Sequence, residues 1–230
     1  MKSTDVKFGL VNEYIDTRRT KIEAVSKLIV KTYKDEKDKN NQKNTTYKKS
    51  YNILIYQGSR CNQNTFWDFN ELIILAHAVY GWMPTILAIC SDDEEDVDAP
   101  SFRDDTKDRI KKAVAGLSSF NISSPNFFDE KTFNELITVA KFTNNSFVGA
   151  SKFLHFIYPD QFAIWDSKIF GILNQELAND DKTNGFFATQ NANCMRNFIG
   201  YQWAMQAARA RLNEEVELRA IESVLFDMAN

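Results

Sequence analysis

The sequence predicts an all-α fold, and three features of the 230-residue chain support this prediction. Only eight Gly and four Pro are present, fewer than a turn-rich all-β protein needs. Apolar residues recur at helical spacing over long stretches, and only a trace of strand is expected. The hydrophobic fraction of 43% is enough for one compact domain or two closely packed subdomains around a shared core.

The N-terminal half is expected to hold long helices separated by polar segments. Residues from about Val6 to Lys34 predict one long amphipathic helix. The polar residues 35–50 predict a flexible loop, and the weak alternation from Tyr51 to Gln57 predicts a short strand or a buried extended segment. Asn70 to Trp82 predict a buried helix, and the acidic run from Ser91 to Pro100 predicts a solvated loop.

The C-terminal half is expected to be helical with clear start and stop signals. One helix should end near Gly116, and another should begin after Asp129, which is a suitable N-cap. A helical run from about Met195 to Asp227 is expected to break near Leu212 and Asn213.

Between these helices the stretch "SKFLHFIYPDQFAIWDSKIFGIL" places a lysine and an aspartate near two helix starts. We expect Lys152 in the first turn of a short buried helix that Pro159 ends. The helix dipole and burial would both favour a neutral, nucleophilic amine there. After an extended segment from Phe162 to Trp165, Asp166 is expected at an N-cap, where an ionised carboxylate is stabilised. The alternative is structural: an aspartate that only caps its helix and a lysine that extends into water.

Charge and cysteine content limit the possible functions. The net charge is −3, so contact with DNA has to be local rather than spread over a basic surface. The three cysteines are far apart, form no CxxC pair, and stand beside only two histidines, so we expect no metal and no cofactor. A reducing, cytoplasmic location is expected, with no signal peptide and no membrane-spanning segment.

The stretch from Asn144 to Asn174 resembles the signature region of the helix-hairpin-helix DNA glycosylases. In "AIWDSKIF", Asp166 to Ile169 follow the family order of Asp, a small hydroxyl residue, a basic residue and a branched apolar residue, and "VGASK" resembles the hairpin and its early lysine more loosely. A single hairpin glycine, Gly149, and a shortened interval between Lys152 and Asp166 indicate a divergent branch. That branch is similar to the oxoguanine-glycosylase-like proteins, since the cysteine cluster of the iron–sulfur members is missing.

The resemblance implies a single domain over residues 1–230, with two helical subdomains flanking a cleft and a degenerate helix-hairpin-helix motif. The N-terminal helical part would span about 1–120, and the hairpin and catalytic part about 121–230. It further implies excision of a damaged or modified base from a flipped nucleotide by a monomer, with or without strand cleavage, in repair or in defence against phage with modified DNA.

The resemblance also implies roles for particular residues. Lys152 and Asp166 would be catalytic, as nucleophile and as stabiliser of the sugar cation. Candidate walls of a base pocket are Trp165, His155, Trp82 and Trp67, although core packing is the commoner role of such side chains. Candidate phosphate contacts are Gly149, Ser151, Ser167 and Lys168. Two other interpretations stay open: a non-catalytic helical module that binds DNA or protein on the same scaffold, and a helical domain in which Lys152 and Asp166 are purely structural.

Overall fold

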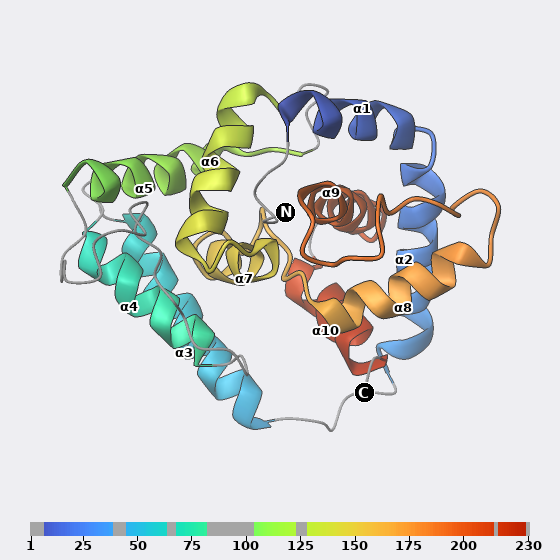
Figure 1. Cartoon of the computed structure of the whole chain (residues 1–230). Helices are drawn as coiled ribbons and strands as arrows, with labels where there is room; N and C mark the ends of the chain where they lie inside the picture. The colour runs from blue at the N-terminus through green and yellow to red at the C-terminus, as the bar shows by residue number, and fades with distance from the viewer. Residues whose placement is uncertain are drawn as a thin grey trace.

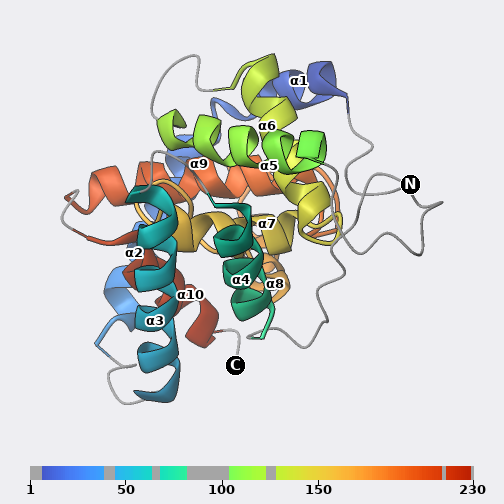
Figure 2. The same cartoon turned by 90° about the vertical axis from the view of Figure 1, so that its left-hand side faces the viewer.

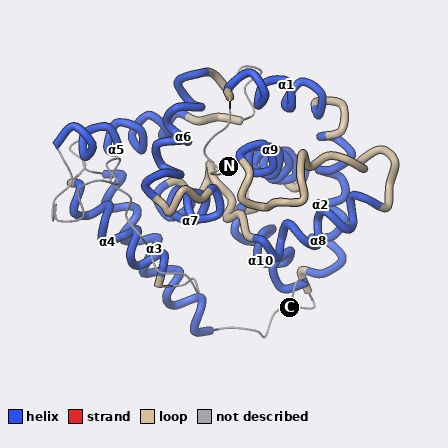
Figure 3. Tube along the Cα trace, in the orientation of Figure 1, coloured by secondary structure: helices blue, strands red, loops and turns tan. Residues whose placement is uncertain are grey.

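The computed structural model describes residues 7–38, 45–63, 68–81, 104–122, 128–213 and 216–228, with the side chains of 45–49 and 62–63 left out. Every regular element in these ranges is helical, and none of the residues within them is in a strand (Figure 3). The prediction of an all-α fold is therefore confirmed. The acidic run from Ser91 to Pro100 lies outside the described residues.

Ten α-helices and one 3-10 turn make up the described fold. They are α1 (Phe8–Arg18), α2 (Ile22–Glu36), α3 (Thr45–Gln63), α4 (Phe69–Tyr80), α5 (Asp104–Gly116), the 3-10 turn (Leu117–Ser119), α6 (Glu130–Phe142), α7 (Phe147–Ile157), α8 (Ser167–Ala178), α9 (Met195–Arg211) and α10 (Leu218–Met228).

Helix α9 is the central element of one group of helices. It packs against α1, α2, α7 and α10, and Figure 1 shows it end-on with these helices around it. Buried residues occur along its whole length and on more than one face, which is typical of a helix surrounded by others. The N-terminal helices α1 and α2 thus pack on the C-terminal part of the chain.

Helix α7 joins this group to a second group formed by α3, α4, α5 and α6 (Figure 2). It packs against α3, α4, α6 and α9, and nine of its residues are buried. Gly58 of α3 lies so close that an added Cβ would stand 1.8 Å from the carbonyl oxygen of Phe156. Every helix contributes to one continuous hydrophobic core. A division near residue 120 with a cleft between two subdomains stays a prediction.

The expected single helix from Val6 to Lys34 is wrong. The chain turns between Arg19 and Lys21, so α1 and α2 are separate helices that both contact α9. A straight helix of that length would extend about 40 Å, and it would leave the central helix instead of wrapping around it.

The expected strand from Tyr51 to Gln57 is also wrong, because these residues lie within α3. Leu54, Gly58 and Cys61 are buried at helical spacing, while Ile53 and Tyr56 are exposed. The flexible loop expected over 35–50 is corrected at both ends, since α2 extends to Glu36 and α3 begins at Thr45.

Other start and stop signals are confirmed. The Asp129 carboxylate accepts a hydrogen bond from the Thr132 amide at the start of α6. Helix α5 ends at Gly116, and the C-terminal run breaks between α9 and α10 as expected. No described helix combines the length and the apolar character that a membrane span needs.

Candidate functional site

The hairpin between α6 and α7 is a short turn, Thr143 to Ser146, in which Asn144 and Asn145 both have positive φ angles. The Ser146 hydroxyl caps α7 by accepting a hydrogen bond from the Gly149 amide at 3.0 Å. Asparagine tolerates this left-handed conformation better than most residues. The sequence predicts the hairpin turn within the stretch "VGASK", but the turn lies before this stretch.

Gly149 and Ser151 do not present their amides to a phosphate, which corrects both predicted contacts. Gly149 lies in the first turn of α7, and an added Cβ would stand 2.1 Å from the Tyr80 hydroxyl. That hydroxyl donates to the carbonyl of Thr143 at 2.9 Å. Ser151 is fully buried within α7. Gly149 is thus required by close packing between α4 and α7.

Lys152 is the sixth residue of α7 and not a first-turn residue as expected, because the helix already begins at Phe147. The dipole argument for a neutral amine therefore loses its basis, since the effect is confined to the first turn. Pro159 acts as expected, because α7 ends two residues before it, at Ile157.

The segment from Phe162 to Trp165 is extended, as expected, and it runs through a helical core. Extended backbone inside a helical core needs partners for its amides and carbonyls. Side chains from α7, α9 and α10 supply them, and we call these four residues the link clamp: Ser151, His155, Gln202 and Glu222.

The bonds of the link clamp follow the segment residue by residue. His155 Nδ1 lies 2.6 Å from the Phe162 carbonyl oxygen, and the Gln202 amide bonds both the amide and the carbonyl of Ala163 at 2.7 Å. Glu222 Oε2 accepts from the Ile164 amide at 2.7 Å. The Ser151 hydroxyl bonds the amide and the carbonyl of Trp165 at 2.9 and 3.1 Å.

Asp166 follows the clamped segment directly and is the N-cap of α8, as predicted. Its Oδ1 accepts from the Lys168 amide at 2.9 Å, and its Oδ2 lies 2.8 Å from Lys152 Nζ. Both side chains are 16% exposed. Burial alone would raise the pKa of Asp166, but the charge and hydrogen bond of Lys152, with the Lys168 amide, lower it below its ordinary value.

The pairing has a consequence for Lys152. Its side-chain nitrogen lies 2.8 Å from a carboxylate oxygen, which is the geometry of a salt bridge. The resting site therefore holds an ion pair, whereas the sequence had led us to expect an uncharged amine beside a charged acid.

His155 lies one helical turn after Lys152 and is fully buried. Its Nε2 lies 2.7 Å from the Tyr51 hydroxyl, and its Nδ1 faces the Phe162 carbonyl. Burial lowers the pKa of His155 to about 4, although the Phe162 carbonyl acts in the opposite sense. His155 is thus a neutral core residue that connects α3 to the extended link, not an exposed pocket wall.

The predicted aromatic walls have different outcomes. Trp165 is fully buried, donates its indole N–H to the Ala192 carbonyl at 2.8 Å, and packs against Phe170, Phe187 and Tyr201. No surface of Trp165 is left for a base, so it belongs to the core. Trp67 and Trp82 lie outside the described residues.

Ser167 and Lys168 are both exposed in the first turn of α8. The Lys168 amide is used by Asp166, and its ammonium group lies 5.4 Å from the centre of the Phe226 ring. A ligand at the start of α8 would therefore contact the side chains of Ser167 and Lys168 rather than the Lys168 amide.

Sequence reasoning missed four residues around the extended link: Tyr51, Gln202, Arg219 and Glu222. Each was assigned only to a general helical or extended pattern, and no local signal marks it. Arg219 and Glu222 are three residues apart, a spacing also found in exposed ion pairs on helices. The burial of Glu222 comes from the contact of α10 with the link, which a pattern along the sequence does not contain.

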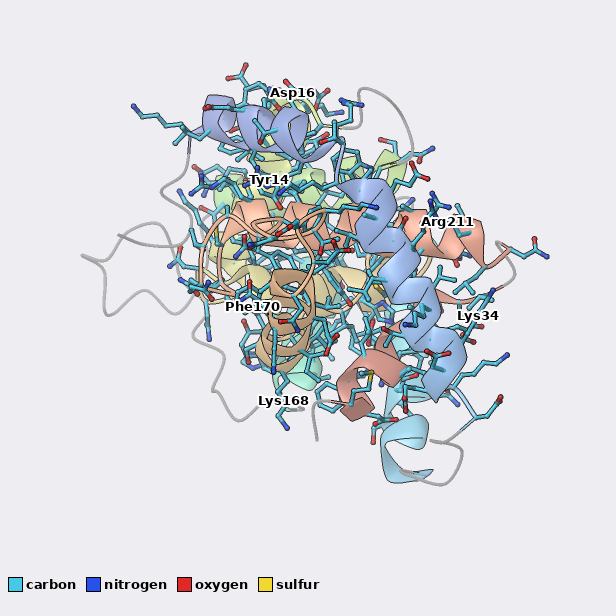
Figure 4. The ribbon with its side chains drawn as sticks, turned by 90° about the vertical axis from the view of Figure 1, so that its right-hand side faces the viewer. Tyr14, Asp16, Lys34, Lys168, Phe170 and Arg211 are labelled. Atoms are coloured by element: carbon cyan, nitrogen blue, oxygen red, sulfur yellow. The ribbon has the colours of Figure 1, made fainter. Side chains whose placement is uncertain are left out.

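Among the described residues, no group of three or more His, Cys, Asp or Glu side chains is arranged to hold a metal ion. A hollow that neither Lys152 nor Asp166 lines lies along α2 and the end of α9. It is lined by Lys27, Lys31, Lys34 and Arg211, with Asp35 the only acid among the described lining residues. Figure 4 shows Lys34 and Arg211 on this side of the molecule.

The chain matches no protein-family model, and comparisons with curated proteins and with solved structures found no significant similarity. The functional assignment therefore depends on the site's own geometry and chemistry.

Proposed function

We propose that the chain is a DNA glycosylase that removes a damaged or modified base, with Lys152 and Asp166 as its reacting pair. The observation that carries this proposal is the 2.8 Å contact between Lys152 Nζ and Asp166 Oδ2. It joins the middle of α7 to the start of α8, and both side chains keep 16% of their surface exposed. An amine and a carboxylate are thus held together at a point that solvent can reach.

The chemistry follows from the two groups. The target nucleotide is flipped out of the duplex, and the bond between C1′ of the deoxyribose and the base nitrogen breaks. The base leaves with the bonding electrons, and positive charge develops on the sugar. Asp166, held ionised by its amide and ammonium partners, stabilises that charge.

The ion pair also supplies a proton. The Lys152 ammonium group gives one proton to the departing base nitrogen and becomes a neutral amine. The amine lone pair then forms a bond to C1′. Opening of the sugar ring, with a second proton moving from nitrogen to O4′, gives a Schiff base that permits strand cleavage. If water adds to C1′ instead and passes its proton to the neutral Lys152 amine, the product is an intact strand with an abasic site.

Contact with DNA is provided locally in this proposal. Ser167 and Lys168 are exposed at the start of α8 beside Asp166, where their side chains would contact a phosphate. The basic hollow along α2 offers a second place for the phosphate backbone. Both features agree with the overall charge of −3, which requires DNA contacts to be concentrated.

The deciding experiment incubates the purified protein with DNA carrying a panel of oxidised, alkylated and otherwise modified bases, and detects released bases by mass spectrometry. We expect release of at least one base. Borohydride should trap a covalent adduct that Lys152→Gln abolishes. Asp166→Asn should abolish release and keep the fold, since Asn is also a good N-cap. Lys112→Gln, an exposed change on α5, is the matched control. Absence of any released base across the panel would refute the proposal.

A second measurement tests the DNA surface. If Lys31 and Lys34 each neutralise one phosphate, Lys31→Gln with Lys34→Gln should reduce the slope of log K against log salt by about 1.5 to 2. The same double change at Lys111 and Lys112 on α5 is the control and should leave the slope unchanged. Equal slopes for both variants and the unmodified protein would exclude the α2 surface from DNA contact.

One observation favours a second candidate, a non-catalytic module that binds DNA. The Lys152–Asp166 pair satisfies itself in the resting structure, which is also what a structural pair would do. Binding to DNA without base release, unchanged by Asp166→Asn, is the result that this second candidate predicts.

A further inference from the structure

A second ion pair, Arg219–Glu222, is connected to the segment that leads to Asp166, because Glu222 bonds the Ile164 amide. It is formed within α10, Glu222 is fully buried, and the Arg219 side chain is 28% exposed. Burial raises the pKa of Glu222, and the charges of Arg219 and Lys152 act against this rise. The two ion pairs are therefore close enough to interact electrostatically.

Glu222 is placed as an ionised carboxylate by its hydrogen bonds. Oε1 accepts from the Arg219 guanidinium, and Oε2 accepts from the Ile164 amide at 2.7 Å. A carboxyl group that accepts through both oxygens from nitrogen donors uses its deprotonated form. Ile164 lies two residues before Asp166, so Glu222 holds the backbone that leads to the proposed reacting carboxylate.

Arg219 extends the network to the second group of helices. Its guanidinium lies 5.0 Å from the centre of the Tyr51 ring, and the Tyr51 hydroxyl bonds His155. Three of the four elements around the link, α3, α7 and α10, are thereby connected through side chains. The fourth, α9, contributes Tyr201, whose buried hydroxyl has no hydrogen-bond partner among the described residues and is influenced by Glu222, Arg219 and Asp166.

The stability of the fold does not explain why this pair of residues is charged. Replacing a buried ion pair by neutral side chains of similar size is often neutral or stabilising, because desolvation offsets the attraction between the charges. A neutral side chain at position 222 would also serve as acceptor for the Ile164 amide. The charges of Arg219 and Glu222 therefore call for a function beyond holding the backbone.

We propose that Glu222, held by Arg219, is a positioning residue that orients Asp166 and balances the charge around Lys152. This inference rests on the proposed glycosylase function. The four charged groups sum to zero in the resting state. When Lys152 releases a proton to the leaving base, the set becomes negative by one charge, which matches the positive charge that develops on the sugar. Glu222 acts through Asp166 and Lys152 and does not touch the substrate.

The test replaces the pair by neutral residues that keep the backbone bond, Arg219→Met with Glu222→Gln. Single-turnover base release, DNA affinity and thermal unfolding are measured for this variant, for Arg219→Lys, and for a control pair on α6, Lys131→Met with Glu135→Gln. We expect the neutral variant to unfold within a few degrees of the unmodified protein and to bind DNA within about threefold, but to release base at least tenfold more slowly. Arg219→Lys should recover most of the rate, and the control pair should retain it.

Release by the folded neutral variant within threefold of the unmodified rate would overturn the inference. If the neutral variant fails to fold, the folded Arg219→Lys variant is used instead. Loss of base release in Arg219→Lys as complete as in Asp166→Asn would also overturn the inference. If the unmodified protein releases no base, the proposed function fails separately. The positioning role is then judged by an NMR titration of the Asp166 carboxyl. We expect its pKa to rise in the neutral variant, because a displaced Asp166 loses part of the bonding to Lys152 and the Lys168 amide that lowers it, and an unchanged pKa would refute the role.

Discussion

The coupling between Lys152 and Asp166 can be measured against a matched pair in the same molecule. Lys27 and Glu23 are also 2.8 Å apart, but their side chains are 62% and 64% exposed, whereas those of Lys152 and Asp166 are each 16% exposed. The distance is equal and the burial differs, although Glu23 also lies 3.5 Å from Arg211. The comparison therefore sets a largely buried ion pair against an exposed one.

The magnitude for the buried pair follows from its geometry. Coulomb attraction at the observed distance amounts to about 6 kcal/mol with an effective dielectric constant of about 20. Desolvation removes most of this attraction, and a hydrogen bond between charged groups retains about 1.5 to 3 kcal/mol. We expect a coupling free energy of about 2 kcal/mol at pH 7. The exposed pair should show a much smaller coupling, because solvent and salt screen it.

The assay is a double-mutant cycle in urea with Lys152→Met, Asp166→Asn and the double variant, and with Lys27→Met and Glu23→Gln for the exposed pair. The pKa of Asp166 is lowered in the folded state, so its contribution is present above the unfolded pKa of about 3.9 and is lost as the pH falls through the folded pKa. The coupling should therefore decline well below pH 4. A coupling at pH 7 no larger than that of the exposed pair would refute this reasoning.

Three further predictions concern stability. Gly58→Ala should destabilise the protein by about 1 to 3 kcal/mol, because the added Cβ would collide with the Phe156 carbonyl. Gly171→Ala in α8 is the control: its Cβ meets no atom, and it should stabilise the protein by about 0.5 to 1 kcal/mol. Equal unfolding midpoints for the two variants would contradict the close approach of α3 and α7. The pKa of His155 is about 4 in the folded state, below its unfolded value, so the free energy of unfolding should fall by about 3 kcal/mol as the pH is lowered from 6.5 to about 4. Denaturation across this range should show this dependence of the free energy on pH, and His155→Gln should remove it. An unchanged dependence in that variant would exclude His155 as its cause. Tyr201→Phe should leave the free energy of unfolding unchanged or raise it, because the buried hydroxyl has no partner among the described residues; urea denaturation showing a loss above about 1 kcal/mol would reveal a hydrogen bond.

The parts of the site that the sequence predicted depend on local signals. An aspartate before an apolar helical pattern predicts an N-cap, and Asp166 caps α8. Pro159 predicts the end of the preceding helix, and α7 ends just before it. With a short extended link between them, the meeting of Lys152 and Asp166 follows from chain geometry over 14 residues.

The parts that the sequence did not predict depend on distant packing. Glu222 bonds the amide of Ile164 across 58 residues, and a glutamate in a helical pattern is ordinarily an exposed residue. Gly149 was interpreted as a hairpin glycine, but its lack of a side chain is required by Tyr80, which is 69 residues earlier in the chain. In the same way, the sequence predicts a short strand or a buried extended segment only for Tyr51 to Gln57, because the buried stripe of α3 is completed by contacts with α4 and α7.

An extended segment inside a helical core has to be compensated wherever it occurs, and this requirement explains why the site has so many polar partners. Ser151, His155 and Gln202 compensate the link with neutral groups, as a purely structural solution would. Glu222 alone uses a charge, which then needs Arg219 to balance it. A fourth neutral acceptor would have completed the structure at a lower desolvation cost. The charge at this one position, bonded to the link residue that lies two before Asp166, is the observation on which the proposed positioning role of Glu222 rests.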